Sequence, residues 1–259
     1  MNPFYFGTSE RRIFGIYEPA ALGSKRKRAA VLCYSWGPEY LYAHRTMRQL
    51  AIKLSMAGVH TLRFDYFGTG DSGGDAADAD LKGWESDIAL AIEEIKDMVD
   101  VTKVSLIGLR LGATVAASVA TKLWKEIDAL VLWDPIVSGK EYQLSLDPGE
   151  RERWHGGPKA AGESAQVREA SGFVCSTSMI RELPALNLGD MISPPRTRTL
   201  MLVTERFPFH QSLAPVPGGG QSGSLDIEYM EAVHPWIEDP TLTGVVPVGV
   251  IQRIVNWLG

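Results

Sequence analysis

The sequence predicts an α/β protein with a mostly parallel central sheet, helices on both faces and one inserted region. Short apolar runs typical of buried strands alternate with longer segments whose apolar residues recur at helical spacing. Strands that alternate with helices form parallel sheets through right-handed crossovers. Residues 138–195 interrupt this alternation and are rich in Gly, Ser, Glu and Arg. We therefore expect residues 1–259 to form one domain, with 138–195 as a lid or cap within it.

Each predicted element follows from a local pattern. Residues 4–18 place short apolar runs around a polar turn, which favours an opening hairpin. Unbroken apolar runs predict buried strands at 29–34, 59–64, 103–107, 129–133, 199–203 and 227–233. Helical spacing of apolar residues predicts helices at 42–57, 84–99, 112–120 and 250–258. We find no clear strand pattern within 138–195.

Composition excludes several classes of partner. The net charge of −5 argues against a nucleic acid or an anionic membrane surface. No apolar stretch approaches the roughly 20 residues of a membrane span, and no signal-peptide pattern opens the chain. The two cysteines, Cys33 and Cys175, lack metal-ligand spacing, so we predict no cofactor and no metal, and a cytoplasmic location.

The most informative motif is Gly108-Leu109-Arg110-Leu111-Gly112. A predicted strand leads into it and a small-residue helix leaves it, which is the context of the Gly-x-Ser-x-Gly nucleophile elbow. Glycines flank the centre because the turn is too tight for side chains on both sides. Arg110 stands where a hydrolase carries serine. A guanidinium stays protonated and cannot attack a carbonyl, so the usual nucleophile is missing.

The order of these parts resembles the α/β-hydrolase superfamily across nearly the whole chain. Residues 34–40 stand where that family has its His-Gly oxyanion loop. Residues 63–72 look like its DxxGxGxS loop after the fourth strand, where Asp65 and Ser72 are expected to tie the backbone together. The resemblance implies the α/β-hydrolase fold.

A closer resemblance is to serine-aminopeptidase-type and exosortase-associated hydrolases of bacteria. Three motifs carry it: Gly37-Pro38-Glu39-Tyr40, His44-Arg45-Thr46-Met47-Arg48-Gln49-Leu50-Ala51 and Trp133-Asp134-Pro135-Ile136-Val137-Ser138-Gly139. This resemblance implies a role in bacterial biosynthesis or export. Arg110 is the departure from ordinary family members.

A base and an acid would follow the elbow in chain order. His234 comes after the last predicted strand, where the family places its histidine; a loop histidine that caps backbone is the other interpretation, and His210 is an alternative base. Asp134 ends a strand and is a candidate acid, although an Asp-Pro turn also uses aspartate to cap amides. Glu205, after another strand, is the second candidate acid.

Ser35 is the remaining candidate nucleophile, because it lies in the oxyanion-loop equivalent. Arg110 has two interpretations: it binds a carboxylate or phosphate through its two-pronged guanidinium, or it forms an ion pair with Asp134, Glu39 or Glu205 that plugs the old site. We assign catalysis to His234, Asp134 and Ser35, and substrate binding to Arg110, Leu109, Trp36, Gly37 and Glu39.

Three functions remain open. The first is an enzyme on a small acyl or anionic substrate, in which His234 assists hydrolysis, a lyase step or a cyclisation without an acyl-enzyme. The second is a catalytically dead pseudo-hydrolase that binds a carboxylated ligand, and the third is a scaffold subunit. The retained base and acid favour the first. The expected partner is a small acyl or carboxylate ligand, and a homodimer is left open.

Overall fold

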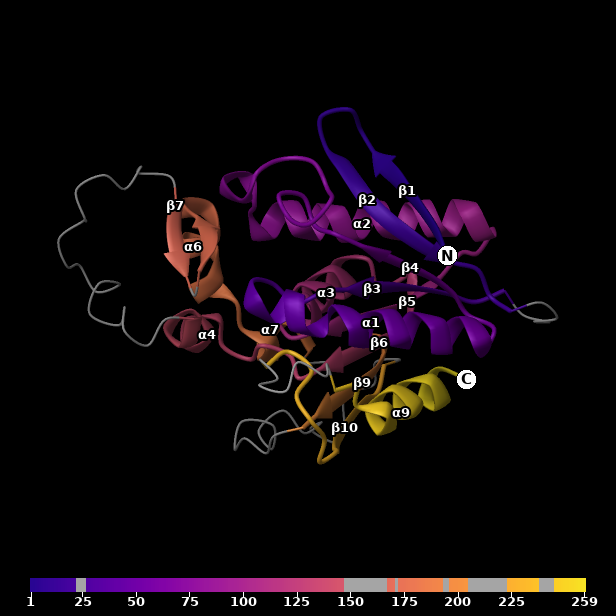
Figure 1. The fold of residues 1–259 in the computed structure, drawn as a ribbon. Coiled ribbons are helices and arrows are strands. Elements are labelled where there is room, and N and C mark those ends of the chain that lie inside the picture. The colour runs from indigo at the N-terminus through magenta and orange to yellow at the C-terminus, as the bar shows by residue number, and fades with distance from the viewer. Residues whose placement is uncertain (22–26, 147–166, 171, 193–195, 205–222, 238–244) are drawn as a thin grey trace, which may run out of the picture.

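The computed structural model describes residues 1–21, 27–146, 167–170, 172–192, 196–204, 223–237 and 245–259 (Figure 1). The candidate acid Glu205 and the alternative base His210 lie outside the described residues. So do residues 147–166 of the inserted region.

The described strands form an eight-stranded sheet in the order β1-β2-β4-β3-β5-β6-β9-β10. The strands are β1 (Asn2–Gly7), β2 (Arg12–Glu18), β3 (Ala29–Cys33), β4 (His60–Phe64), β5 (Val104–Leu109), β6 (Ile127–Trp133), β9 (Arg198–Val203) and β10 (Leu225–Tyr229). β1 and β2 form the predicted antiparallel hairpin, and β2 is antiparallel to β4. All pairings from β4 to β10 are parallel. The mostly parallel sheet predicted from the sequence is confirmed.

Helices cover both faces of this sheet (Figure 1). The main helices are α1 (Pro38–Met56), α2 (Leu81–Val99), α3 (Leu111–Lys122) and α9 (Val248–Leu258). α1 packs on α9, whereas α2 packs on α3. α1 begins four residues earlier than predicted, because Gly37 turns the chain at φ 64° and Pro38 then fits the first helical position. α2 begins at Leu81 because the Asp80 side chain accepts a hydrogen bond from the Gly83 amide at 2.6 Å.

The inserted segment contains more regular structure than the sequence predicts. It holds α4 (Gly139–Leu146), the strands β7 (Val167–Ala170) and β8 (Phe173–Ser176), α6 (Thr177–Glu182) and α7 (Leu188–Ile192). β7 and β8 form an antiparallel hairpin, so the expectation of no strand in 138–195 is wrong. Glu182 fixes this segment to the rest of the fold, since its Oε2 accepts a hydrogen bond from the Leu81 amide at 2.7 Å.

The last strand is also shorter than predicted, ending at Tyr229 instead of residue 233. Its parallel partner β9 ends at Val203. The Val203 carbonyl accepts a hydrogen bond from the Met230 amide at 2.9 Å, directly after the last paired residue of β10. Beyond that point the described residues offer no neighbouring strand for the backbone to pair with. His234 therefore lies farther from the end of its strand than the sequence suggests.

Parallel strands bring their carboxyl ends to one edge of the sheet. β3, β5, β6 and β9 end at Cys33, Leu109, Trp133 and Val203. The residues that follow these four strands therefore meet at the same edge, where the predicted site residues lie.

Candidate functional site

Arg110 is the single residue between β5 and α3, and its backbone is strained. Its backbone has φ 55° and ψ −124°, close to the first central residue of a type II′ turn, at about +60° and −120°, where glycine is preferred. The Arg110 amide donates to the Trp133 carbonyl at 3.0 Å, and the Arg110 carbonyl accepts from the Ala113 amide at 3.0 Å. The turn is therefore held from both sides despite its conformation.

The flanking glycines are required by contacts with backbone. A Cβ on Gly112 would lie 2.0 Å from the carbonyl oxygen of Tyr34, and a Cβ on Gly108 would lie 2.3 Å from the Cα of Ala113. No side-chain rotation relieves either contact. The pattern read from the sequence thus has a direct physical cause, and Gly112 brings the end of β3 against the first turn of α3.

The Arg110 guanidinium has three neighbours among the described residues. Nε donates to Oε1 of Glu39 at 2.9 Å, and Nη1 donates to the carbonyl of Asp134 at 3.2 Å. The guanidinium carbon lies 5.0 Å from the centre of the Trp236 ring, a cation–π distance. These contacts use two of the five N–H groups, so within the described part of the chain the guanidinium keeps unpaired donors.

Glu39 lies in the first turn of α1 and pairs with Arg110 as the sequence allowed. Its side chain is 14% exposed. Oε2 accepts a hydrogen bond from the hydroxyl of Tyr142, on α4, at 3.3 Å. Burial raises the pKa of the Glu39 carboxyl, and the charge of Arg110 and the bonds from Arg110 and Tyr142 oppose this rise. Glu39 therefore uses one of the hydrogen-bond donors of Arg110. This arrangement lies between a guanidinium that is free to bind an anion and one that is fully paired within the protein.

Asp134 follows β6 with a backbone φ of 41°. Its Oδ1 accepts from the Thr204 amide at 2.7 Å, and its Oδ2 accepts from the Thr204 hydroxyl at 2.9 Å. Burial raises the pKa of this carboxyl; the bonds from Thr204 and then the charges of Arg110 and His234 lower it. Asp134 thus caps the backbone after β9, and it lies within electrostatic reach of His234.

Trp236 lies between His234 and Arg110 and contacts both. The rings of His234 and Trp236 stack with centroids 4.9 Å apart and an interplanar angle of 8°. Trp236 is 8% exposed and also faces the Arg110 guanidinium. The structure therefore brings Arg110, Asp134 and His234 into one neighbourhood.

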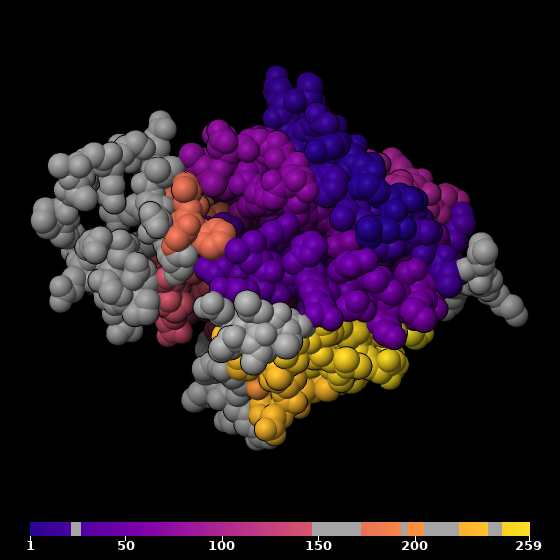
Figure 2. All heavy atoms as spheres, viewed as in Figure 1, coloured from indigo at the N-terminus to yellow at the C-terminus, as the bar shows by residue number. Residues whose placement is uncertain are grey.

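The other predicted residues surround the turn with less defined roles. Ser35 is 2% exposed, and its Oγ has no hydrogen-bond partner among the described residues. Trp36 is buried. A Cβ added to Gly37 would lie 3.9 Å from Cγ of Phe173, so Gly37 faces the side chain of this β8 residue. Figure 2 shows residues of this hairpin, in orange, beside the purple atoms of α1. Leu109 is fully buried at the end of β5, so its side chain belongs to the core.

The loop after β4 is tied together as predicted. The Asp71 amide donates to Oδ2 of Asp65 at 3.0 Å, and the Ser72 hydroxyl donates to the Asp65 carbonyl at 2.6 Å. The hydroxyl of Tyr40, on α1, donates to Oδ1 of Asp65 at 2.8 Å. Asp65 is therefore a structural residue that joins this loop to the start of α1.

Tyr142, Thr204 and Trp236 were missed by sequence reasoning. Trp236 stands two residues after His234, a signal that could have been used. Tyr142 and Glu39 are 103 residues apart in the sequence, and a local sequence pattern cannot predict a contact between residues so far apart.

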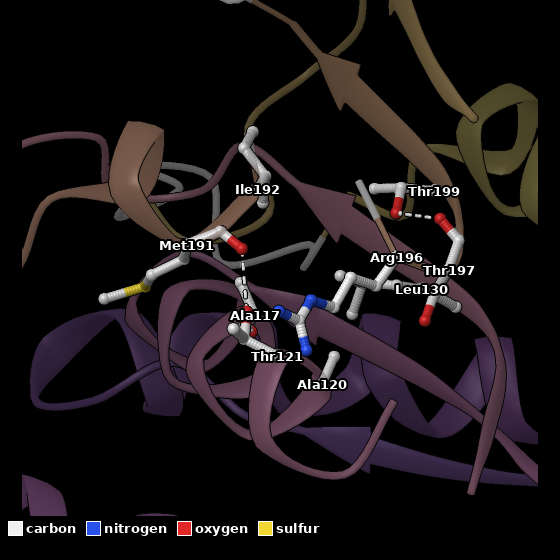
Figure 3. A pocket seen from close by; sticks show the side chains of 9 residues that line it. All are labelled: Ala117, Ala120, Thr121, Leu130, Met191, Ile192, Arg196, Thr197 and Thr199. Atoms are coloured by element: carbon white, nitrogen blue, oxygen red, sulfur yellow. Dashed lines mark hydrogen bonds between the residues drawn. The ribbon is translucent and has the colours of Figure 1, made fainter. Parts of the chain in front are cut away.

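A hollow lies away from this edge, between α3, α7 and the start of β9 (Figure 3). Its lining includes Thr121, whose hydroxyl donates to the Met191 carbonyl at 2.7 Å, and the side chain of Arg196. Thr197 and Thr199 lie at the beginning of β9, whereas Asp134 and Thr204 follow the ends of strands. This hollow contains none of the predicted site residues.

Among the described residues, no group of three or more His, Cys, Asp and Glu could hold a metal ion. No described helix is long and apolar enough to cross a membrane.

The chain was compared with known proteins. The family model of serine aminopeptidase, S33, matches residues 42–171. A search of curated proteins gives no significant match.

Solved structures resemble the whole chain. Est1E from Butyrivibrio proteoclasticus with bound ferulic acid is 15% identical, with a TM-score of 0.68, and the match covers 98% of this chain and 99% of that one. DcsB in complex with its substrate analogue is 18% identical, with a TM-score of 0.66 and coverage of 99% and 98%. The thioesterase domain from the curacin biosynthetic pathway is 14% identical, with a TM-score of 0.60 and coverage of 100% and 99%. Identities this low establish a shared fold and nothing finer.

Proposed function

The chain belongs to the serine aminopeptidase S33 family of α/β hydrolases, and on this premise we propose that it acts on a small acyl or carboxylate ligand without a serine acyl-enzyme. In this proposal Arg110 occupies the nucleophile position of the family's elbow. The observation that carries it is the strained, positive-φ turn at Arg110, with a guanidinium whose donors are only partly used by the residues that the structure describes. The proposed location is the cytoplasm, since both cysteines are free.

Arg110 suits an anion for two reasons. A guanidinium matches a carboxylate or a developing oxyanion with two parallel hydrogen bonds. Arg110 also precedes the first turn of α3, a helix of 12 residues, and the amino end of a helix favours negative charge. We assign the ligand's anionic group to the donors that Glu39 and the Asp134 carbonyl leave unused.

His234 is the proposed general base, with Asp134 as the acid that stabilises its charged form. The charge of His234 already lowers the pKa of Asp134, against the larger effect of burial. Such a pair supports hydrolysis by an activated water, a lyase step or a cyclisation. Residues 138–195 are the proposed cap of a single domain, because Tyr142 and Phe173 of this segment lie against the start of α1.

The alternative is a catalytically dead ligand-binding or scaffold protein of a biosynthetic or export system. Two contacts favour it. Glu39 already pairs with Arg110, and both carboxylate oxygens of Asp134 accept hydrogen bonds from Thr204. A buried ion pair kept for structure would show the same geometry.

The first test asks whether any serine reacts. The protein is incubated with a fluorophosphonate and its mass is measured. We expect no adduct, and stoichiometric labelling of Ser35 or any other serine would contradict the proposal.

The second test asks whether Arg110 binds an anion. Thermal unfolding is measured with acetate, butyrate, benzoate and ferulate for the wild type and for Arg110→Lys. A ligand at about 100 times its dissociation constant adds about 2.7 kcal/mol to the stability of the wild type. Lysine keeps the charge but loses the second parallel bond, so its binding should be weaker by about 1–2 kcal/mol. Equal binding by both proteins would show that Arg110 does not bind the anion through two parallel hydrogen bonds.

A third test separates catalysis from binding. Acyl esters and thioesters are incubated with the wild type and with His234→Gln, and products are measured by mass spectrometry. Turnover by the wild type that is lost in His234→Gln, with ligand binding retained, identifies an enzyme. Binding without turnover in both proteins identifies the pseudo-hydrolase.

A further inference from the structure

Glu39 shares the guanidinium that an anionic ligand would need. Its Oε1 lies 2.9 Å from Nε of Arg110, and its Oε2 lies 3.3 Å from the Tyr142 hydroxyl. Both oxygens are thus in use before any ligand arrives. Arg110 is 22% exposed and Glu39 is 14% exposed in their side chains, so water screens this pair only in part.

The carboxyls at this edge oppose the binding of a further anion unless one of them takes up a proton. Among the described residues, Arg110 supplies one positive charge, and two carboxyls supply negative charge: that of Glu39, which accepts a hydrogen bond from Arg110, and that of the buried Asp134, which lies within its electrostatic reach. A ligand carboxylate would be the third carboxylate around one guanidinium. A buried charge that lacks a partner is costly, and a protein usually avoids that cost by changing the protonation of one group.

We propose that Glu39 is the specificity-determining residue of the Arg110 site, and that a carboxylate ligand binds there together with a proton taken up by Glu39. This inference rests on the proposed function, since it assumes that Arg110 receives the ligand's anionic group. The ligand carboxylate takes over the pairing with Arg110, and the neutral carboxyl of Glu39 remains beside it as a hydrogen-bond donor or acceptor. The site therefore accepts a monocarboxylate and rejects a ligand that brings further negative charge.

Glu39 is a better proton acceptor than Asp134. Asp134 keeps two hydrogen bonds from Thr204 in the presence of a ligand, and both bonds favour its ionised form. Glu39 would lose its ionic bond to Arg110 and keep only the bond from Tyr142. Burial already raises the pKa of Glu39, and a second carboxylate at Arg110 raises it further.

The groups that face Glu39 are few within the described part of the chain. Arg110 faces it from the turn between β5 and α3, and Tyr142 faces it from α4, with Cys175 of β8 beside Tyr142. Arg110 remains charged at every relevant pH. The Tyr142 hydroxyl donates to the ionised form of Glu39, so Tyr142→Phe should raise the pKa of Glu39 without removing the carboxyl.

The experiment is isothermal titration calorimetry with acetate, butyrate and benzoate between about pH 5.5 and about pH 8, where simple carboxylic acids are ionised. Each titration is repeated in two buffers of different ionisation enthalpy, which measures the protons taken up. For the wild type we expect uptake approaching about one proton per ligand, and a dissociation constant that rises by up to about tenfold per pH unit. The dissociation constant rises with pH in the interval between the pKa of Glu39 in the free protein and its higher pKa in the complex.

Three variants make the prediction specific to Glu39. Glu39→Gln should bind without proton uptake, with little pH dependence and with tighter binding than the wild type at about pH 8. Tyr142→Phe should keep the slope but move it to higher pH. Glu141→Gln is the matched control, because Glu141 is exposed on α4 next to Tyr142 and should leave the profile unchanged.

The outcomes separate this inference from the proposed function. If the wild type binds a carboxylate and Glu39→Gln shows the same proton uptake, another group takes the proton and the inference is wrong while the anion site stands. If neither protein binds any of the three carboxylates, the anion site at Arg110 is itself wrong. If Glu39→Gln does not fold, the shift expected for Tyr142→Phe decides the matter, and an unchanged profile in that variant overturns the inference.

Discussion

Replacing Arg110 by glycine should give a more stable protein than replacing it by alanine. Arg110 has φ 55° and ψ −124°, a conformation that a residue with a Cβ adopts at a cost. Both substitutions remove the same side-chain contacts, with Glu39, the Asp134 carbonyl and Trp236, so these losses cancel in the comparison. The difference between the two variants then reports the backbone alone.

The expected magnitude follows from two opposing terms. A non-glycine residue in such a region carries about 1–3 kcal/mol of strain. Glycine gains more freedom in the unfolded chain, which costs about 0.5–1 kcal/mol of stability. The midpoints of these two ranges give a net advantage of about 1 kcal/mol for Arg110→Gly over Arg110→Ala. At Arg48, an exposed position inside α1, the order should reverse, with alanine favoured over glycine by about 1 kcal/mol.

Urea unfolding of the four variants measures these differences as free energies of unfolding. The comparison requires that all four share one denaturant slope, which shows that the unfolded states are alike. An Arg110→Ala protein as stable as Arg110→Gly, with the normal order at Arg48, would refute the assignment of strain to this turn.

Two further predictions concern stability. Gly112→Ala should cost more than about 3 kcal/mol, because its Cβ would lie 2.0 Å from the Tyr34 carbonyl oxygen. Gly249→Ala, in α9, should be neutral or slightly stabilising in the same urea assay, because among the described residues its Cβ would meet only the Met230 side chain, at 3.9 Å. Equal losses at both sites would contradict the packing argument. Burial lowers the pKa of His60, whose Nδ1 accepts a hydrogen bond from the Ala20 amide at 3.3 Å, so the unfolded chain binds a proton near pH 6.5 that the folded protein resists, and stability should fall as the pH drops below about 6.5. The melting temperature of His60→Asn should fall less steeply than that of the wild type over this range, and parallel curves would show that His60 does not contribute.

Local patterns predicted the fold well. The α/β-hydrolase fold with its mostly parallel sheet is confirmed, because buried strands and amphipathic helices are each determined by residues close together in the chain. The turn at Arg110 belongs to the same category, since two glycines at fixed spacing encode it. Element boundaries were less accurate: the strand ending at Tyr229 depends on where its neighbour β9 stops, which its own residues do not specify.

The candidate site was only partly predictable. The sequence placed Arg110, Asp134 and His234 at strand ends, and parallel topology then brings such residues together. It left open which carboxylate meets Arg110, and the structure brings Glu39 there through the first turn of α1. Tyr142 could not be predicted, since its contact depends on how the inserted segment packs.

The position of β3 has a consequence for how the chain folds. β3 pairs with β4 on one side and with β5 on the other, and its five residues are all buried. β5 follows about 70 residues later in the chain, so during synthesis at roughly 5–20 residues per second one edge of β3 stays unpaired for several seconds. An unpaired strand edge presents free backbone N–H and C=O groups and is a template for association with other chains. Long-range parallel pairing also makes folding slow. The order of the strands in the chain therefore determines how long this edge stays unpaired, and a mutation that leaves the final stability unchanged can still lower the yield of folded protein by delaying the pairing of β5 with β3.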